Sequence, residues 1–371
     1  MGSIDPYDTA AGRRYRVRYR TPERRQTDRR GFKSKREAEL FLASVEVSKA
    51  RGEFIDDADA RVTIAELGAR WVTTRTHLKP SSLRPVETAW RVHVEPRWGR
   101  VRVGSVQHSD VQDWVTGLSA EKSATVVLRA YGVLASILDV AVADRRIATN
   151  RARGVKLPRK TSKAHVYLTH QQVHDLADAS GGRRTLVLTL AYTGLRWGEA
   201  IGLRVRDLDM LRRRINVTVN AVEVGGVIEV GTPKTHKRRA VAFPAFLAED
   251  LARACTDKGR DDLVFADAHG QHLRRTRTSA GSRSWFKTAL DTAGLEAMTL
   301  HDLRHTAASL AISSGANVKA VQRMLGHASA AMTLDVYADL FDDDLEALAN
   351  GLDQAARAAV VGRAWADSTT G

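Results

Sequence analysis

The chain has 371 residues, with 58 lysines and arginines against 43 acids, a formal net charge of +15 and a pI near 10.2. This length predicts two or three domains of about 150 residues. The charge favours a nucleic-acid partner over a membrane surface, because the basic residues do not gather on one amphipathic helix. No apolar run reaches the ~18 residues of a membrane span, and no secretory signal is visible. A single cysteine, Cys255, excludes a disulfide framework and a cysteine-based zinc site, so we expect a cytoplasmic protein.

The most basic segment is 11–36, which holds twelve lysines and arginines and two acids. Between residues 14 and 20 apolar side chains alternate with arginines, which predicts a strand with one aromatic and one cationic face. A second strand is expected at 29–33, and Ser34 with Glu37 has the capping-box pattern of a helix start. We expect this small ββα module to bind DNA, the alternative being a solvated arm without a target. The DNA-binding candidates are Arg14, Arg16, Arg18, Arg20, Arg29, Arg30 and Lys33.

Residues 62–153 predict a helical domain whose first helix begins with a capping box at Thr63. Three further amphipathic patterns follow, at 81–94, 109–118 and 123–143. We expect the first of these three to end before Pro96. Four such helices with short connections favour a compact bundle. Residues 154–164 are basic and lack periodicity, which predicts a linker, and Lys160 within it is a further candidate DNA contact.

Residues 165–350 predict a domain that mixes helices with a small sheet, followed by a tail at 351–371. Thr169 caps the first helix, and a buried helical segment ends at Gly194. Gly225 and its neighbouring glycine predict a hairpin turn between two short strands. Strands are expected at 215–219, 221–224, 227–230 and 239–243, with helices from 246 onward.

Two motifs in this domain place a cation where a phosphate could be bound. Arg196 follows the helix that ends at Gly194 and begins another, so its guanidinium adds to a helix N-terminus that attracts anions. Lys234 lies between two predicted strands, on an expected hairpin tip that can reach a bound backbone. Each motif alone is equally typical of a solvated surface cation.

A third motif, His301-Asp-Leu-Arg-His305, opens a helix. His301 and Arg304 are three residues apart and therefore share a face. His301 and His305 are spaced like the histidines of the zinc motif H-E-x-x-H, but Asp302 replaces the glutamate and no third ligand follows. We therefore expect no metal here, and a buried structural role for His305.

The fourth motif is Leu-Gly-His327, with Tyr337 ten residues later. A free phenol has a pKa near 10, so a tyrosine is a poor nucleophile unless it is activated. Two arginines, a lysine, two histidines and a tyrosine suit phosphoryl transfer without a metal. In such chemistry the arginines neutralise the nonbridging oxygens, the tyrosine attacks phosphorus and the lysine protonates the leaving oxygen.

The order TGLR, K, HDLRH, LGH and Y resembles that of the tyrosine recombinases, in particular the phage-type integrases, and the resemblance covers nearly the whole chain. It implies that Arg196 and Arg304 hold the scissile phosphate and that Lys234 is the general acid on the 5′-oxygen. Glu199 matches the acidic position that organises the first arginine. One departure is Asn150-Arg151, where the family often has Asn-Pro.

The same resemblance implies that His301 and His327 support the phosphate and the proton transfers. Tyr337 would form a covalent 3′-phosphotyrosine bond and release a 5′-hydroxyl, which conserves the bond energy. No ATP, metal or other cofactor is therefore implied. The hydroxyl of a second strand then attacks the phosphotyrosine and reseals the DNA, so that strands are exchanged through a Holliday junction.

The implied architecture is multidomain and mainly α with small β-sheets. It comprises a small β/α arm-binding module at 1–60, a helical, SAM-like core-binding domain at 62–153 and a mixed α/β catalytic domain at 165–350. The implied partners are double-stranded DNA with core-type and arm-type sites, a homotetramer on DNA, a host DNA-bending protein and an excisionase, with no membrane. The arginine-rich composition indicates GC-rich codons and hence a phage of a high-GC, actinobacterial host. The acidic segment 335–353 predicts a terminal helix that packs either on its own domain or on a neighbouring protomer.

Three other interpretations stay open at this point. A chromosome-dimer resolvase or a mobile-element transposase would use the same chemistry, although the basic segment 11–36 argues against a minimal resolvase. A type IB topoisomerase is a close chemical relative. A non-enzymatic DNA-binding regulator would use each motif as a phosphate-binding patch, but six suitable side chains are improbable by chance.

Overall fold

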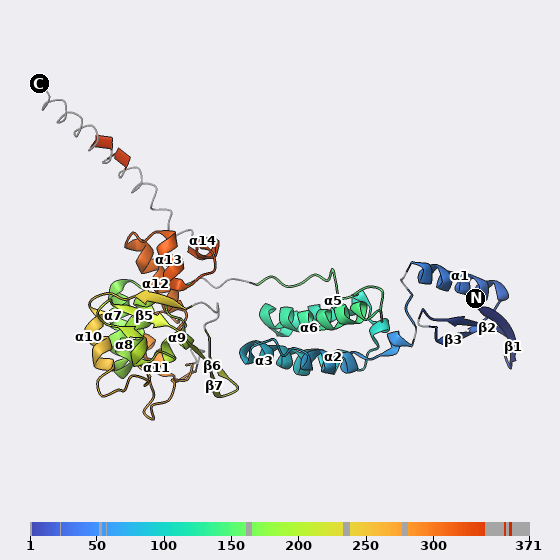
Figure 1. Cartoon of the computed structure of the whole chain (residues 1–371), viewed down its shortest axis with the longest axis horizontal. Coiled ribbons are helices and arrows are strands. Elements are labelled where there is room, and N and C mark those ends of the chain that lie inside the picture. Colours follow the sequence, from blue (N-terminus) through green and yellow to red (C-terminus); the bar gives the residue numbers. More distant parts are fainter. Residues whose placement is uncertain are drawn as a thin grey trace, which may run out of the picture. The chain divides into compact units, whose positions relative to one another are not determined.

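The computed structural model describes residues 2–22, 24–51, 54–56, 58–160, 165–232, 238–276 and 281–337, together with 352, 353, 356 and 357. The chain divides into two compact units, residues 1–162 and 163–371. The first unit contains a sheet-and-helix module and a helical domain, and the second is a mixed α/β domain (Figure 1). The predicted class, mainly α with small sheets, is confirmed.

The N-terminal module is an antiparallel sheet of three strands in the order β1-β2-β3, with one helix packed on it. Its elements are β1 (Ser3–Thr9), β2 (Gly12–Arg20), β3 (Gln26–Phe32) and α1 (Lys35–Ala50). Val17 and Tyr19 of β2 are buried in its core, so the predicted alternation is confirmed. The prediction of two strands was wrong, because the edge strand β1 is polar and contains Pro6.

The start of α1 forms half of the predicted capping box. The Ser34 hydroxyl accepts a hydrogen bond from the Glu37 amide at 3.2 Å. The Glu37 carboxylate accepts from the Lys33 amide at 2.9 Å, one residue before the cap. The helix therefore begins where the pattern predicts, with the return bond displaced by one residue.

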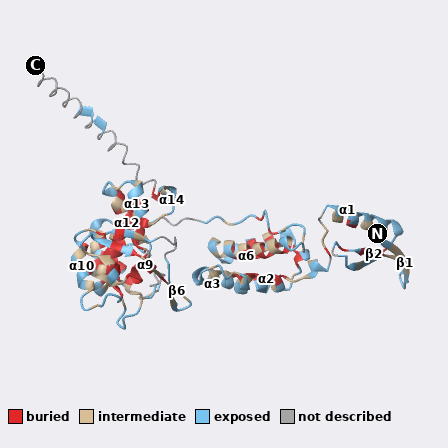
Figure 2. Ribbon diagram, in the orientation of Figure 1, coloured by how far each residue is buried: buried red, intermediate tan, exposed pale blue. Residues whose placement is uncertain are grey.

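The helical domain is built around α6, whose nine buried residues form much of its core. Its elements are η1 (Asp59–Arg61), α2 (Ile64–Thr73), α3 (Pro80–Ala89), η2 (Trp90–Val94), α4 (Glu95–Trp98), η3 (Val103–Ser105), α5 (His108–Glu121) and α6 (Ala124–Ala143). The Thr63 capping box on α2 is complete. By length and composition alone α6 could cross a membrane, but its apolar side chains pack inside this domain, where Figure 2 shows buried residues on α6 and α2.

We predicted that the second helix of this domain ends before Pro96, and this prediction was wrong. α3 passes through the π-helical segment η2 directly into α4. The π turn changes the hydrogen-bond register just before Pro96, which enters at the start of α4, where a missing N–H costs little. Trp98 is thereby buried in the core, with its ring edge-on to Trp114.

The stretch after α6 is docked on the helical domain as far as Lys156. Asn150 turns the corner, because its amide donates to the Ala135 carbonyl and to Asp139 while its oxygen accepts from the Ala152 amide. Tyr131 donates to the Ala152 carbonyl at 2.9 Å. The departure from Asn-Pro therefore leaves an ordered corner in which Asn150 makes the contacts.

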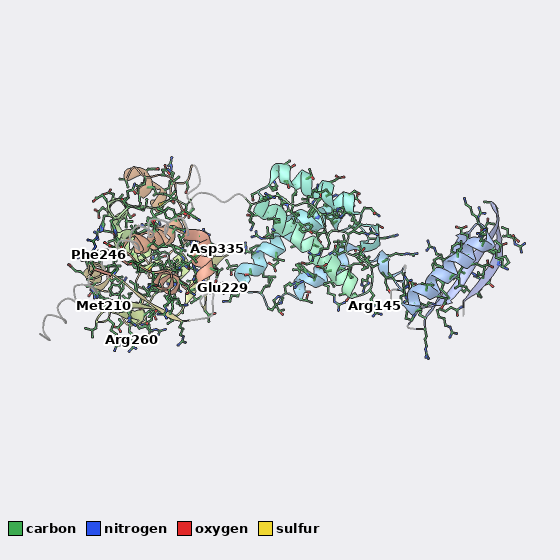
Figure 3. All side chains as sticks on the ribbon, turned by 90° about the horizontal axis from the view of Figure 1, so that it is seen from above. Arg145, Met210, Glu229, Phe246, Arg260 and Asp335 are labelled. Carbon is green, nitrogen blue, oxygen red and sulfur yellow. The ribbon has the colours of Figure 1, made fainter. Side chains whose placement is uncertain are left out.

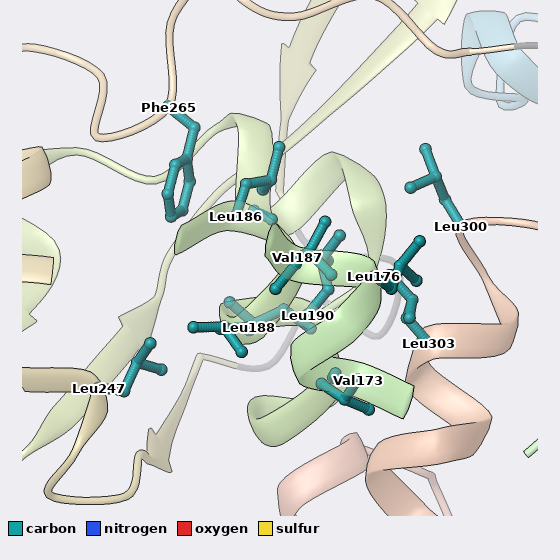
Figure 4. Close-up of a cluster of buried hydrophobic side chains, with 14 of the residues drawn as sticks. Val173, Leu176, Leu186, Val187, Leu188, Leu190, Leu247, Phe265, Leu300 and Leu303 are labelled. Atoms are coloured by element: carbon teal, nitrogen blue, oxygen red, sulfur yellow. The ribbon is translucent and has the colours of Figure 1, made fainter. Parts of the chain in front are cut away.

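The second unit has its core around α8. Its helices are α7 (His170–Ala179), η4 (Gly181–Arg183), α8 (Arg184–Thr193), α9 (Trp197–Ile201), η5 (Val205–Asp207), α10 (Leu247–Ala254), α11 (Trp285–Thr292), α12 (Asp302–Ser313), α13 (Val318–Leu325) and α14 (Ala330–Tyr337). Figure 4 shows Val187, Leu188 and Leu190 of α8 surrounded by side chains of α7, α10 and α12. Arg260, labelled in Figure 3, is one of the exposed charged residues of this unit.

Two small sheets flank this core. Their strands are β4 (Leu208–Asp209), β5 (Arg214–Val217), β6 (Asn220–Val224), β7 (Val227–Gly231) and β8 (Arg239–Ala242). β6 and β7 form the predicted hairpin, and Gly225 and Gly226 have φ values of 65° and 86°, which favour glycine. β8 pairs with β5 and not with β7. The strands before and after Lys234, β7 and β8, therefore do not pair with each other as the predicted hairpin requires, and Lys234 itself lies outside the described residues.

Candidate active site

Glu199 is a buried carboxylate held between two arginines. It lies on α9, and its side chain has no exposed surface. Arg196 donates to it through Nη1 and through its backbone amide, both at 2.9 Å. Arg239, which opens β8, donates with both Nη atoms at 2.9 and 2.7 Å. Burial opposes ionisation of Glu199, but hydrogen bonds and charges from Arg239 and Arg196 outweigh it and lower its pKa, so the carboxylate is ionised.

Arg304 joins three segments that are distant in the sequence. Its side chain extends from α12 and is only 3% exposed. Nη1 donates to the Gly194 carbonyl and Nη2 to the Leu325 carbonyl, both at 2.5 Å. These carbonyls lie two residues before Arg196 and two residues before His327, so one guanidinium ties together the segments that carry three of the predicted residues.

The two glycines beside these contacts need their conformation. Gly194 ends α8 with a φ of 62°, and a Cβ there would lie 2.8 Å from the Leu325 side chain. Gly326 ends α13 with a φ of 65°, and a Cβ there would lie 2.9 Å from the Arg239 side chain. Glycine is therefore required at both positions by backbone strain and by the close approach of neighbouring groups.

Burial and like charge also set the electrostatics of this cluster. They lower the pKa of Arg304 to about 9, first through burial and then through Arg196 nearby. The guanidinium stays charged at neutral pH, yet it is short of compensating negative charge. An entering phosphate would supply that negative charge, and Arg304 still has N–H groups to offer, since an arginine has five and two are used here.

Two of the predicted histidines are neutral in this environment. Burial, followed by the charge of Arg304, lowers the pKa of His301 and lowers that of His327 to about 4. His327 Nδ1 lies 3.0 Å from the Thr333 hydroxyl, which fixes its ring. A neutral imidazole can hydrogen-bond a phosphate oxygen or relay a proton without adding to the charge.

Tyr337 is the last residue of α14 and is 2% exposed. Its ring packs in an apolar cluster with Ile312 and Leu325. Its hydroxyl lies 2.8 Å from Nδ1 of His305, and burial raises its pKa to about 12. His305 was predicted to be a buried structural residue. It is buried, at 9% exposed, but its ring contacts the proposed nucleophile.

His165 completes a histidine cluster at the start of α12. Its ring stacks on that of His305 with centroids 3.8 Å apart and an interplanar angle of 26°. His165, Asp302 and His305 hold potential ligand atoms within 4.8 Å of one another. The ring lone pairs of stacked imidazoles lie in nearly parallel planes and do not meet at one point, so a metal ion would require one ring to turn. The arrangement fits ring stacking better than chelation.

A cavity of about 920 Å³ opens beside this cluster. Arg196 and His301 line it together with Arg275 and the β6–β7 hairpin. A bound backbone lying in it would meet Arg196 and His301 directly. The lining mixes apolar side chains with the cations Arg196 and Arg275, which can bind the phosphates of a DNA backbone.

Six of the predicted site residues thus lie in one network: Arg196, Glu199, His301, Arg304, His327 and Tyr337. Sequence reasoning missed Arg239, His165 and the contact of His305. An arginine that opens an apolar strand was a weak signal for Arg239. Nothing in the spacing pointed to a partner for His305, because Tyr337 is 32 residues away.

The predicted DNA-binding residues of the arm module lie on two faces. Arg14, Arg16, Arg18 and Arg20 alternate with buried side chains and therefore occupy the face opposite α1. Arg30 pairs across from Arg16 and joins that face. Arg29 pairs across from Val17, and its guanidinium lies 4.9 Å above the Phe41 ring on the helix side. Lys33 and Lys160 are exposed.

Known proteins resemble both units of the chain. Residues 166–343 match the phage integrase family and residues 8–49 match an arm DNA-binding domain. The integrase of Mycobacterium phage D29 is 28% identical over 321 residues, which cover 82% of this chain and 84% of that protein. The tyrosine recombinase XerD of Mycobacterium tuberculosis is 30% identical over 282 residues, covering 68% and 84%.

Solved structures show the same fold. The Tn1549 transposon integrase in complex with a circular intermediate DNA has a TM-score of 0.66 at 22% identity, covering 77% of this chain and 99% of that one. A lambda integrase dimer bound to a core site has a TM-score of 0.58 at 19% identity, covering 91% and 94%. Together with the family match and the clustered site residues, these findings show that the chain belongs to the phage integrase family and is a site-specific tyrosine recombinase, an enzyme of DNA integration and recombination.

Proposed function

We propose that the chain integrates a phage genome at attachment sites by cleaving DNA through a 3′-phosphotyrosine bond on Tyr337. The observation that carries this proposal is the pair of bonds from Arg304 to the Gly194 and Leu325 carbonyls. They hold the segments of Arg196 and His327 around one point, and Tyr337 approaches the same helix through His305. Cations, neutral imidazoles and a phenol around one position are the groups that phosphoryl transfer needs.

In this mechanism Arg196 and Arg304 bind the nonbridging oxygens of the scissile phosphate. Glu199 fixes the guanidinium of Arg196 through the 2.9 Å bond. Tyr337 attacks phosphorus, and Lys234 protonates the departing 5′-oxygen. The new phosphotyrosine ester conserves the energy of the broken bond, so the 5′-hydroxyl of a second strand can attack it and reseal the backbone.

His301 and His327 complete the mechanism as neutral groups around the phosphate. His301 lines the cavity beside Arg196, where it can donate a hydrogen bond to a nonbridging oxygen. His327 is held by Thr333 and lies in the field of Arg304 and Arg196. Its low pKa keeps the local positive charge on the arginines.

The partners follow from the same proposal. The arm module would bind arm-type sites through its cationic sheet face and the helical domain would bind core-type sites, so that two modules gain avidity by linkage. A lambda integrase tetramer has been solved on a Holliday junction, and we propose a homotetramer on DNA here also. A host DNA-bending protein and an excisionase for the reverse reaction complete the set.

The test is a nicked DNA substrate from which the cleaved end diffuses away, incubated with EDTA. A protein–DNA adduct on a denaturing gel, mapped to Tyr337 by mass spectrometry, is the expected result. Y337F should form no adduct and should bind DNA as tightly as the wild type. Y192F is a matched control, because the Tyr192 hydroxyl also bonds a histidine, His170, at 2.8 Å in the same domain.

Two outcomes would contradict the proposal. An adduct that persists in Y337F would place the nucleophile elsewhere, and the absence of any adduct on a verified attachment site would leave a protein that only binds. Deletion of residues 1–60 should abolish recombination of arm-bearing DNA, whereas a minimal resolvase would not need them. Relaxation of supercoiled DNA without sequence preference would identify a topoisomerase instead.

A further inference from the structure

The hydroxyl of Tyr337 has a specific partner that the mechanism above does not use. His305 Nδ1 lies 2.8 Å from it, with the ring centroids 5.7 Å apart. The tyrosine ring is otherwise surrounded by apolar side chains such as Ala308, Ile312 and Val321. A buried hydroxyl costs free energy unless it is hydrogen-bonded, so this contact decides where the phenol oxygen lies.

His305 is itself held on two sides. The ring of His165 stacks on it at 3.8 Å, and the ring of His301 meets it edge-on with centroids 5.1 Å apart at 89°. Its backbone follows directly after Arg304 on α12. The position of the phenol oxygen is thereby coupled to the helix that carries the proposed phosphate-binding arginine.

The two ionisation states show what the contact can do. Burial raises the pKa of Tyr337 to about 12, and burial with the neighbouring His165 lowers the pKa of His305 to about 4. Transfer of the phenol proton to this imidazole is therefore strongly disfavoured in the resting protein. The bond is one between two neutral groups, which orients the phenol without ionising it.

We propose that His305 is a positioning residue for the nucleophile: its Nδ1 holds the Tyr337 hydroxyl against α12, so that the oxygen is aligned with the phosphate bound by Arg304. The inference rests on the proposed function of Tyr337. In this role His305 neither takes up a proton during the reaction nor contacts the phosphate. Misplacement of a reacting atom by about 1 Å can cost on the order of 100-fold in rate, which is the scale of effect to be expected.

Three substitutions of His305 separate alignment from simple packing. An asparagine side chain carries a polar atom at the δ position, as Nδ1 does, whereas glutamine carries it one bond further away and alanine carries none. In single-turnover cleavage of the nicked substrate we expect H305A and H305Q to be slower by about 10- to 100-fold. H305N should stay within about fivefold of the wild type, because it retains an acceptor at the right distance from the backbone.

A second pair of variants tests the stacking contact from the surface. The His165 side chain is 38% exposed, so its replacement leaves the core intact. H165A should slow cleavage less than H305A does, and H165F, which keeps an aromatic ring over His305, should restore most of the rate. Affinity for uncut DNA, measured for all five variants, should stay close to that of the wild type. The thermal midpoint of each variant should stay well above the assay temperature, so that cleavage rates compare folded proteins.

A sulfur substrate locates the defect on the nucleophile side of the reaction. With a 5′-bridging phosphorothiolate the leaving thiolate needs no general acid, so K234A should regain activity while H305A should not. Equal rates for wild type and H305A would overturn the inference, as would equal losses in H305N, H305Q and H305A. Absence of an adduct in the wild type would instead refute the proposed function itself, so the two failures are distinguishable.

Discussion

The arm module and the catalytic domain both depend on arginine but place it in opposite surroundings. On the arm sheet Arg18 and Arg30 have side chains 42% and 63% exposed, and their partners are the surface acids Asp5 and Asp28. In the catalytic domain Arg304 is buried and bonded to two carbonyls, and Arg239, with its side chain only 11% exposed, is bonded to the buried carboxylate of Glu199. Exposed arginines supply screened, salt-dependent affinity, whereas buried ones supply a fixed geometry. The difference teaches that the same residue type is left free to pair with surface charges in one module and is fixed in a single geometry in the other.

The largest expected effect follows from removing the fixed geometry while keeping the charge. R304K should lower the single-turnover cleavage rate by about 1,000-fold or more, because the single nitrogen of a lysine cannot replace the two separate Nη atoms that reach the Gly194 and Leu325 carbonyls and also present a planar fork to a phosphate. Binding to uncut DNA, measured by fluorescence anisotropy, should change little. R253K on α10 is the control, since Arg253 is an exposed arginine paired with Glu249. Retention of more than a tenth of the rate in R304K would contradict the role assigned to its bonds.

The buried ion pair of Arg239 should govern stability. R239A leaves the Glu199 carboxylate buried with one partner fewer, and we expect the free energy of unfolding to fall by about 3 kcal/mol in urea titration. R184A removes partly exposed pairs with Asp178 and Asp250 and should cost less than about 1 kcal/mol. Equal losses in the two variants would show that burial of Glu199 does not matter.

The exposed arginines should act on affinity alone. The double variant R16A/R18A should weaken binding to arm-type DNA by about tenfold. It should also lower the slope of log affinity against log salt concentration by about one to two, and leave core-site cleavage unchanged. D5N should strengthen arm binding by a few-fold, because Asp5 lies 3.7 and 3.4 Å from these guanidinium groups. A cleavage defect in R16A/R18A on core-only DNA would break the proposed division between the two modules.

The smallest effect concerns pH. The pKa of His305 is about 4 in the folded protein, against about 6.5 when unfolded, so acid protonates the unfolded chain first. Stability should therefore be full above pH 6.5 and fall as the pH drops toward 4, by about 1 kcal/mol for this residue between pH 7 and 5.5. H305N should flatten that slope in thermal melts. If stability falls with pH equally steeply in H305N and the wild type, groups other than His305 determine the loss of stability in acid.

Local signals predicted much of the fold. The capping boxes at Thr63 and Thr169, the helix end at Gly194 and the hairpin at Gly225 are each encoded within a few residues. β1 and the pairing of β8 with β5 were not predictable in this way, because an edge strand and a sheet partner are defined by chain segments elsewhere. The π turn between α3 and α4 was not predictable either, because a proline such as Pro96 usually indicates the end of a helix.

The residues of the site also divide into those indicated by local motifs and those defined by contacts between distant segments. Arg196, Arg304 and Tyr337 stand in motifs whose order alone points to the chemistry. The contacts of Arg239 with Glu199 and of His305 with Tyr337 span 40 and 32 residues, and no local pattern encodes them. Sequence reasoning therefore found the groups that would touch the phosphate and, through the family resemblance, Glu199 beside Arg196. It missed Arg239 and the contact of His305, which hold Glu199 and Tyr337.

The dependence of Arg304 on two distant carbonyls has a consequence for the newly made chain. A ribosome completes Arg196 more than a hundred residues before Arg304, and Leu325 later still. Until all three segments are docked, the cationic chain can cling to nucleic acid but has no oriented guanidinium to hold a phosphate, and Tyr337 is synthesised after every one of them. Nascent or partly unfolded copies are therefore expected not to cleave DNA, since the ability to break a strand arises only with the finished domain.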